Sequence, residues 1–276
     1  MNRTELTDTI RRQQNYLCVG LDSDLTRIPK HLLAQPDPVF AFNKAIIDAT
    51  KAHCVAYKIN TAFYESNGVK GWETMERTVN YIPNTHLRIA DAKRGDIGNT
   101  SSQYARAFFE ALPFDAVTVA PYMGEDSIRP FLEYKDKFTI VLGLTSNAGS
   151  ADFQQQDISG MKLYEQVLTK TASWGTVDNL MFVVGATKAG VLTHIRTIIP
   201  DHFLLVPGVG AQGGSLEEVS SCGLNKDCGL LVNASRAIIF ADGSEAFADH
   251  ATTAATTYAT EMQEQLRSLN ILPPSV

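Results

Sequence analysis

The sequence has few cysteines and no metal-binding arrangement of histidines. Its 276 residues include four cysteines (Cys18, Cys54, Cys222 and Cys228), and no two of them form a C-x-x-C pair. We therefore expect reduced thiols that mostly pack in the core of a cytoplasmic protein. The six histidines form no H-x-H or H-E-x-x-H pattern. Neither a histidine general base nor a zinc site is expected.

Long apolar runs and an excess of positive charge are also missing. No stretch approaches the ~18 apolar residues of a membrane span, and the polar start, MNRTELTDTIRRQQNYL, lacks the apolar core of a signal peptide. The net charge is −6, which argues against a nucleic-acid binder because neutralising phosphates needs a basic face. A small-molecule ligand remains the expected partner, with neither nucleic acid nor membrane.

What the chain does contain is a regular alternation of short apolar runs and amphipathic stretches. The expected strands are Tyr16–Gly20, Val55–Ile59, Leu87–Ala90, Ala116–Val119, Thr139–Leu142, Met181–Val184, Phe203–Val206 and Gly229–Val232. The expected helices are Val39–Ala52, Gly71–Tyr81, Ile97–Glu110, Asp126–Tyr134, Lys162–Trp174, Ala189–Ile198, Leu216–Cys222 and Glu245–Leu269. A strand followed by a helix, repeated about eight times, predicts an α/β fold of the (β/α)8 TIM barrel type. A doubly wound open sheet is the alternative, because periodicity alone does not show closure.

The rest of the chain offers few signs of further domains. No linker rich in Pro, Gly or Ser divides it, so one barrel domain over residues 1–276 is predicted, with a short helix around Leu6 and Ile10 before the first strand. No G-x-G-x-x-G follows that strand, which disfavours a dinucleotide-binding sheet. The longest irregular stretch, Thr145–Gly160, directly follows the fifth strand and is a candidate lid.

The most informative segment is Asp91-Ala92-Lys93-Arg94-Gly95-Asp96, which follows an apolar run. Side chains alternate on a strand, so Asp91 and Lys93 should leave its end on the same side. Asp96 falls where a helix is expected to begin, near its positive end. Charges held this close shift one another's pKa, as is common in active sites. A solvated salt-bridge cluster is the ordinary alternative.

A second lysine and an anion site favour the catalytic interpretation. Lys58 lies inside the apolar run Cys54–Ile59, where an unpaired charge would be costly, so Asp91 on the adjacent strand is its expected partner. The glycine-rich stretch Pro207–Gly214 and Arg236 follow the last two strands. Loops at these two places are the usual phosphate cradle of such barrels.

Four motifs together resemble the orotidine 5′-phosphate decarboxylase family. They are the D-x-K-R-x-D-I-x-x-T segment, Lys58, the P-G-V-G-A-Q run ending at Gln212, and Ser235-Arg236. The resemblance runs from Asp22 to Arg236. It implies a (β/α)8 barrel that works as a homodimer with shared active sites and without metal or organic cofactor. The implied reaction is decarboxylation of orotidine 5′-phosphate to UMP in pyrimidine biosynthesis.

The resemblance also implies roles for individual residues. Lys93 would protonate the C6 carbanion that decarboxylation leaves. The other catalytic residues would be Asp91, Asp96 and Lys58, with Asp96 supplied by the neighbouring subunit. By the same resemblance, Asp22 and Asn60 would contact the ribose, and Ile97 and Thr100 would reach the neighbouring subunit's site. Thr145 or Ser146 would bond to the pyrimidine edge, and the phosphate would be bound by Pro207, Gln212 and Arg236.

Two other functions fit parts of this pattern. Sugar-phosphate decarboxylases and synthases on the same scaffold resemble the chain in the D-x-K-x-x-D segment, but they use Mg²⁺ and place an acidic residue after strand two. This chain has Lys58 there. A non-catalytic binder of phosphorylated ligands would be expected to lack one of Asp91, Lys93 or Asp96, and all three are present.

Overall fold

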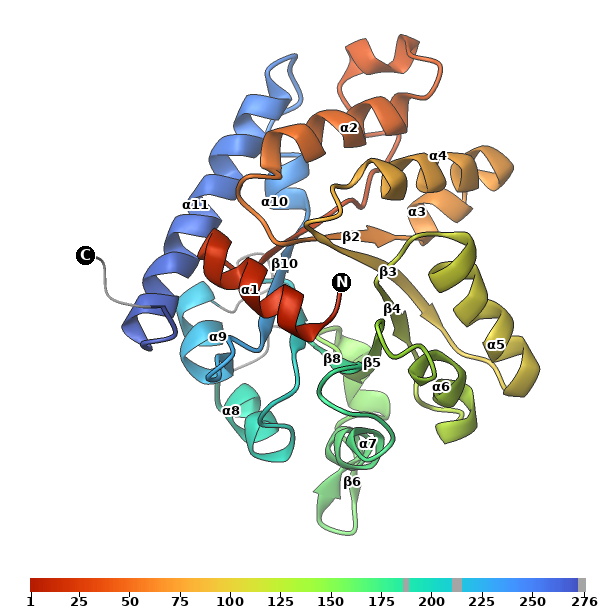
Figure 1. Ribbon diagram of the computed structural model, residues 1–276, viewed down its shortest axis with the longest axis vertical. Helices are drawn as coiled ribbons and strands as arrows, with labels where there is room; N and C mark the ends of the chain where they lie inside the picture. The colour runs from red at the N-terminus through yellow and green to blue at the C-terminus, as the bar shows by residue number, and fades with distance from the viewer. Residues whose placement is uncertain (186–188, 210–214, 273–276) are drawn as a thin grey trace.

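The computed structural model describes residues 1–185, 189–209 and 215–272. Within these ranges, eight parallel strands close into a barrel in the order β1-β10-β9-β8-β5-β4-β3-β2 (Figure 1). The strands are β1 (Leu17–Gly20), β2 (Ala56–Asn60), β3 (Leu87–Arg94), β4 (Ala116–Val119), β5 (Phe138–Leu144), β8 (Leu180–Val184), β9 (Leu204–Pro207) and β10 (Leu230–Ala234). The predicted barrel is confirmed, and closure excludes the open sheet.

Helices surround the barrel and alternate with its strands (Figure 1). They are α1 (Arg3–Gln13), α2 (Pro38–Thr50), α3 (Ala62–Glu65), α4 (Gly68–Tyr81), α5 (Gly98–Arg106), α6 (Glu125–Leu132), α7 (Leu163–Ala172), α8 (Ala189–Ile198), α9 (Leu216–Gly223), α10 (Arg236–Ile239) and α11 (Phe247–Ser268). In the described part of the chain, no helix is both long and apolar enough to cross a membrane.

The short helix predicted before the first strand is α1, and it crosses the amino-terminal end of the barrel (Figure 1). A capping box starts it: Asn2 accepts from the Glu5 backbone, and the Glu5 side chain accepts from the Asn2 backbone. Arg3 then donates to the carbonyls of Val177 and Asp201, which precede β8 and β9. The helix is thereby tied to the ends of two strands.

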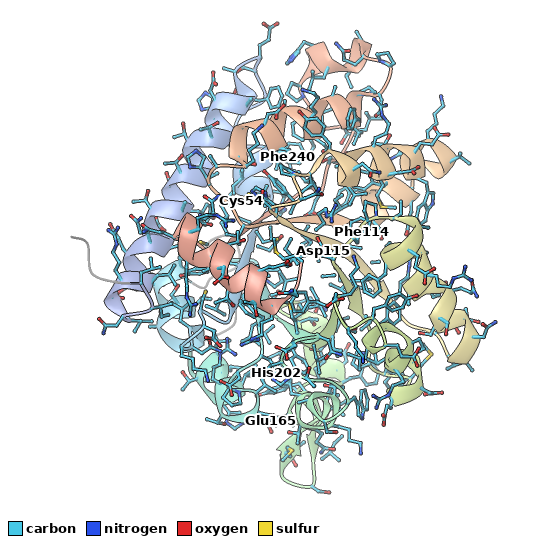
Figure 2. The ribbon with its side chains drawn as sticks, in the orientation of Figure 1. Cys54, Phe114, Asp115, Glu165, His202 and Phe240 are labelled. Atoms are coloured by element: carbon cyan, nitrogen blue, oxygen red, sulfur yellow. The ribbon has the colours of Figure 1, made fainter. Side chains whose placement is uncertain are left out.

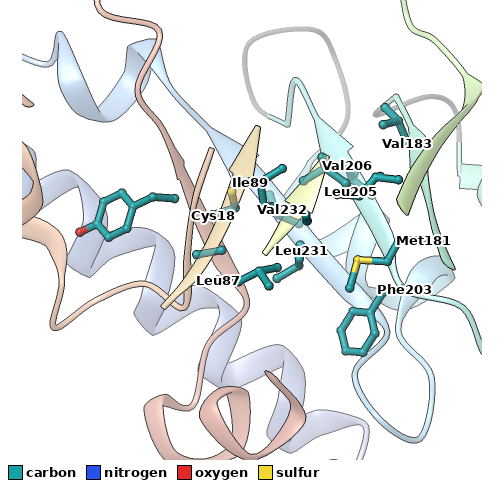
Figure 3. Packing of buried hydrophobic residues seen from close by; sticks show 14 of the residues in the cluster. Cys18, Leu87, Ile89, Met181, Val183, Phe203, Leu205, Val206, Leu231 and Val232 are labelled. Carbon is teal, nitrogen blue, oxygen red and sulfur yellow. The ribbon is translucent and has the colours of Figure 1, made fainter. Parts of the chain in front are cut away.

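Apolar side chains fill the barrel interior and the layer beneath the helices. Leu87, Ile89 and Leu231 lie close together in the close-up of this core (Figure 3). Cys54 and Cys228 are buried as free thiols, and burial raises the pKa of each to about 12. They are packing residues, as expected for most of the cysteines.

Most predicted boundaries differ from the structure by one to four residues, and three of these differences bear on the argument. Strand β3 continues four residues past Ala90 to Arg94, because a bulge keeps the charged segment in the ladder with β4. The expected helix Ile97–Glu110 begins at Gly98, and its last turn, Ala107–Ala111, is a π-helix. The stretch Glu245–Leu269 is helical only from Phe247 to Ser268.

The stretch Thr145–Gly160, expected to be irregular, contains regular structure. A 3₁₀ turn covers Ala148–Asp152. A small antiparallel hairpin follows, made of β6 (Asp157–Ile158) and β7 (Met161–Lys162), and it projects away from the barrel (Figure 1). The expectation of an irregular stretch is therefore wrong for part of this segment, which contains a 3₁₀ turn and a hairpin. Its function as a lid stays a prediction.

Candidate active site

A buried lysine between two carboxylates forms the centre of the site. Lys58 on β2 is 3% exposed. Its Nζ donates to Asp91 Oδ2 at 2.8 Å and lies 3.5 Å from Asp22 Oδ1. The partner predicted for Lys58 is confirmed, and Asp22 is added to it. All three residues are at the carboxyl ends of neighbouring strands, where the catalytic groups of these barrels lie.

These contacts fix the charges of the buried pair. Burial alone would lower the pKa of Lys58, but Asp22 and Asp91 hold it above its ordinary value of 10.5. Burial likewise would raise the pKa of Asp91, but Lys58 and Lys93 hold it well below 3.8. Lys58 is therefore an ammonium and Asp91 a carboxylate at neutral pH.

Lys93 completes the array from the exposed side. Its Nζ donates to Asp91 Oδ1 at 2.6 Å, and half of its side chain is open to solvent. Its backbone is in the left-handed region, with φ +46°, which costs about 1–3 kcal/mol for a residue with a side chain. Such strain at a charged strand end is a mark of functional sites.

Thr118 on β4 stabilises the bulge that presents Lys93. Its hydroxyl donates to Asp91 Oδ1 at 3.0 Å and accepts from the Lys93 backbone N–H at 2.9 Å. Between the pairs Ala90–Val117 and Arg94–Val119, Thr118 is the one residue opposite three on β3. The sequence interpretation missed Thr118 because a threonine within a buried β-branched strand looks like ordinary packing.

The residues expected to act in a neighbouring subunit lie apart from this array. Within the described part of the chain, no hydrogen bond or ion pair joins the Asp96 carboxylate to Lys58 or Lys93; it accepts from the Ile97 backbone at 2.8 Å. Ile97 is 58% exposed, and Thr100 is exposed on the first turn of α5. The structure does not bring these three residues into their own chain's site.

The remaining substrate residues lie at the same end of the barrel. Asn60 ends β2 opposite Asp91, and its Oδ1 accepts from the Ala62 backbone at 3.3 Å. Thr145 and Ser146 directly follow β5, with Thr145 half-buried and Ser146 exposed.

A pocket of about 170 Å³ lies beside Asp22 at the ends of β9 and β10. Pro207 and Arg236 line it, as expected for an anion site. The predicted phosphate residue Gln212 lies outside the described residues. Arg236 is exposed, which leaves its guanidinium open to a ligand.

Two further residues line this pocket: Ser235, which belongs to one of the four motifs, and Asn233, which was not singled out from the sequence. Asn233 Oδ1 and Ser235 Oγ are buried and have no hydrogen-bond partner among the described residues. A Cβ on Gly20 would lie 2.8 Å from Ser235 Cβ and 3.2 Å from Asn233 Oδ1, so only glycine fits there. Unpaired buried polar atoms are costly, and their convergence on one pocket indicates a place for a polar ligand.

The described residues contain no group of three or more His, Cys, Asp or Glu side chains that could hold a metal ion. The acidic residues of the array instead face lysines. Asp22 and Asp91 share Lys58, and Asp91 also meets Lys93.

The match to known proteins agrees with this geometry. The family model described as orotidine 5′-phosphate decarboxylase / HUMPS family matches residues 15–251. The chain belongs to this family. The resemblance read from the four motifs is therefore confirmed.

Similar proteins narrow the relationship within the family. The chain is 57% identical over 273 residues to the orotidine 5′-phosphate decarboxylase of Bacteroides fragilis, covering 98% of this chain and 100% of the relative. It is 57% identical to that of Phocaeicola vulgatus, covering 98% and 99%. The solved structure of Leishmania donovani OMP decarboxylase superposes with a TM-score of 0.83 at 33% identity, covering 96% of this chain and 98% of that one.

Proposed function

We propose that this protein decarboxylates orotidine 5′-monophosphate to UMP for pyrimidine biosynthesis, without a metal ion or organic cofactor. The observation that carries the proposal is the array of Asp22, Lys58, Asp91 and Lys93 at the carboxyl end of the barrel. Curated relatives at 57% identity bear the name of this activity. The pocket of about 170 Å³ beside the array, lined by Pro207 and Arg236, is the proposed binding site of the substrate phosphate.

The reaction breaks the bond between C6 of the pyrimidine and its carboxylate. CO₂ leaves, and the electron pair stays on C6 in an orbital that cannot delocalise into the ring. Lys93 is the group that stabilises this charge and then donates a proton to C6, giving UMP. The lysine regains its proton from water. Asp91, held as a carboxylate by Lys58, keeps the Lys93 ammonium in place.

Electrostatic repulsion of the substrate carboxylate is a smaller contribution. Asp91 facing that carboxylate at ~4 Å would raise the ground-state energy by about 4 kcal/mol at an effective dielectric of 20. Enzymes lower barriers by roughly 8–23 kcal/mol, so repulsion alone is insufficient. We assign the larger share to Lys93, whose charge is already positioned when the carbanion forms.

Binding energy from the rest of the substrate completes the proposal. Asp22 and Asn60 contact the ribose, and Lys58 links a ribose hydroxyl to Asp91. Pro207, Gln212 and Arg236 surround the phosphate. Support comes from Asp22, which lies 3.5 Å from Lys58 and also lines the pocket with Pro207 and Arg236. Binding of the ribose and the phosphate aligns the reacting carbon with Lys93.

The proposed active unit is a homodimer in which Asp96, Ile97 and Thr100 complete the partner's site. Support comes from the exposure of Ile97 and Thr100 at the start of α5, next to the half-buried Asp96. Gly95, which directly precedes Asp96 in the chain, lies beside Met123, which is 44% exposed and whose Cε is 3.2 Å from the Cβ position of Gly95. An exposed apolar face of this kind is typical of an interface. Mixing inactive Lys93→Ala and Asp96→Ala subunits should restore activity, because one hybrid site has both residues. Subunit exchange without any recovery would contradict sharing.

The test of the whole proposal is a spectrophotometric assay with orotidine 5′-monophosphate in excess EDTA. Turnover should persist at the rate measured without chelator. The family description also names HUMPS, so a second activity has to be tested. A magnesium-dependent sugar-phosphate enzyme would leave orotidylate unchanged and would lose its own activity in EDTA. Binding of UMP without turnover of orotidylate would indicate a non-catalytic binder.

A further inference from the structure

Thr118 is a fully buried residue of β4 whose hydroxyl group bonds to both Lys93 and Asp91. It accepts from the Lys93 backbone N–H at 2.9 Å and donates to Asp91 Oδ1 at 3.0 Å. The Lys93 ammonium donates to that same carboxylate oxygen at 2.6 Å. These three bonds close a ring that starts at the Lys93 backbone and returns to the Lys93 Nζ atom.

The direction of the two Thr118 bonds is fixed by chemistry. A backbone N–H is always a donor, so Thr118 Oγ1 accepts from Lys93 and gives its single proton to Asp91. The Asp91 carboxylate, whose pKa lies below its ordinary value, can only accept. Because Thr118 is fully buried, solvent does not compete for either bond.

The three donors to Asp91 divide between its two oxygens. Lys58 donates to Oδ2, whereas Lys93 and Thr118 both donate to Oδ1. A carboxylate turns easily about the bond to its Cβ, so a rigid donor at each oxygen is needed to set its plane. Lys93 is a long, half-exposed side chain, and Thr118 on β4 is therefore the rigid donor at Oδ1.

The second bond of Thr118 supports the backbone of Lys93. The φ of Lys93 is +46°, a conformation that a residue with a side chain rarely adopts. Its N–H lies in the bulge between β3 and β4 and donates to the Thr118 hydroxyl. A backbone N–H left without an acceptor inside the protein is costly, so this bond favours the conformation that directs the ammonium to Asp91.

The far end of the bulge is fixed by other contacts. The Ala120 N–H donates to the Arg94 carbonyl at 2.8 Å, and the Arg94 guanidinium forms an ion pair with Glu65 on α3. Loss of the Thr118 hydroxyl should therefore loosen Lys93 without separating the two strands.

We propose that Thr118 is a positioning residue for the decarboxylation, which acts through Asp91 and through the Lys93 backbone to hold the Lys93 ammonium at the reacting carbon. The inference rests on the proposed function, because it adds a residue to that reaction. Thr118 is buried beneath the charged array and does not touch the substrate. Its hydroxyl should therefore affect the rate of the reaction and not the affinity for the nucleotide.

Two substitutions separate the hydroxyl from the shape of the side chain. Thr118→Val keeps the shape and removes both bonds, so kcat should fall about 10- to 100-fold, the value of one hydrogen bond to a charged group. KM for orotidylate and UMP binding by calorimetry should stay close to those of wild type. Thr118→Ser keeps the hydroxyl and should retain most of the wild-type kcat. If Thr118→Val did not fold, Thr118→Ala would take its place with the same expected result.

Thr139 on β5 offers the matched control. It is 1% exposed and lies opposite Val117 in the β4–β5 ladder. Its hydroxyl has no hydrogen-bond partner among the described residues. Thr139→Val makes the same change in an equally buried strand and should keep the wild-type kcat. An equal loss of kcat in Thr118→Val and Thr139→Val would overturn the proposal.

Hydrogen exchange tests the positioning without reference to turnover. The Lys93 amide should exchange about tenfold faster in Thr118→Val than in wild type, because it has lost its acceptor. Thr118→Ser should restore the slow exchange, and Thr139→Val should leave it unchanged. Unchanged exchange in Thr118→Val would show that Thr118 does not hold the Lys93 backbone.

The kinetic outcomes decide the role of the hydroxyl in the reaction. A wild-type kcat in Thr118→Val would overturn the proposal, and so would an equal loss in Thr118→Val and Thr118→Ser, which would implicate shape instead. UMP binding that weakened in parallel with kcat would make Thr118 a residue of the binding site or of the general fold. Wild-type protein that does not turn over orotidylate would contradict the proposed function itself, whereas the exchange of the Lys93 amide would still decide whether Thr118 holds Lys93.

Discussion

Strand β3 carries a carboxylate–cation group at each of its ends, and the two groups differ in how far the protein shields them from solvent. At the amino end, Arg88 donates through Nε and through its backbone N–H to Asp115 Oδ2, both at 3.0 Å. Asp115 directly precedes β4 and is labelled in Figure 2. At the carboxyl end, Asp91 holds Lys58 and the half-exposed Lys93.

Both carboxylates are held ionised by similar forces. Burial would raise the pKa of Asp115, but the hydrogen bonds from Arg88 hold it below 3.8, as the lysines do for Asp91. The difference lies around them. The Asp115 side chain is 2% exposed and its cation is turned inward, whereas the Asp91 end leaves a lysine open to solvent. An ionised carboxylate is therefore found at both ends of β3. What distinguishes the active end is a cation that remains accessible to solvent and hence to a ligand.

The most direct test of this difference is to remove one lysine from each end of β3. Lys93→Ala should lower kcat by about 10³-fold or more, because it removes both charge stabilisation and the proton donor. UMP should still bind. Lys137 is the matched control at the other end: its Nζ is 3.8 Å from Asp115 Oδ1 and 2.6 Å from the Phe114 carbonyl.

Lys137→Ala should keep the wild-type kcat. The measurement is steady-state decarboxylation together with UMP binding by calorimetry. A Lys93→Ala protein that turns over near the wild-type rate would remove Lys93 from the mechanism, and with it the contrast between the two ends.

A second test weakens the buried ion pair at the amino end of β3. Arg88→Met leaves the buried Asp115 carboxylate without its main partner, and breaking a buried pair in this way costs about 3 kcal/mol of stability. The free energy of unfolding from urea titration should fall by that amount, while kcat per folded molecule stays unchanged. Lost activity with intact stability would show that the amino end of β3 takes part in function.

Much of this arrangement could be predicted from the sequence. The barrel followed from the alternation of apolar runs with amphipathic stretches. The pair of Lys58 and Asp91 followed from the cost of a charge inside an apolar run, and the structure confirms it. These features depend on periodicity or on desolvation, which can be recognised from a short stretch of sequence.

Features that depend on contacts between distant segments were not predicted. Thr118 acts through a bulge whose existence depends on the β3–β4 register. Gln154 reaches Thr145 only because the segment between them folds into a 3₁₀ turn. The buried Asn233 side chain lies against the strand end of β1 only because Gly20 has no side chain. None of these relations has a spacing that a sequence pattern reveals.

A smaller effect is expected at the pocket that the open end shares with Arg236. Arg236→Ala should lower kcat/KM for orotidylate by about 10- to 100-fold, the value of one charge-assisted hydrogen bond to phosphate. Added inorganic phosphite should restore part of the rate, because the anion occupies the vacated site. Unchanged kinetics, with or without phosphite, would place the phosphate elsewhere.

The smallest effect is a shared response of the two ends to acid. The folded-state pKa of Asp115 lies below its unfolded value of 3.8, so its stabilising contribution is complete above about pH 4 and is lost as the pH falls through the folded pKa. The difference in unfolding free energy between wild type and Asp115→Asn should be constant from about pH 7 to 5 and should narrow below pH 4. The difference in unfolding free energy between wild type and Asp91→Asn should also become smaller below pH 4, since the pKa of Asp91 is lowered too. Urea titrations at several pH values measure both. If this free-energy difference stayed constant down to the lowest pH for one of the two residues, its carboxylate would not be held ionised by its partners. The two ends of β3 would then differ in charge as well as in solvent exposure.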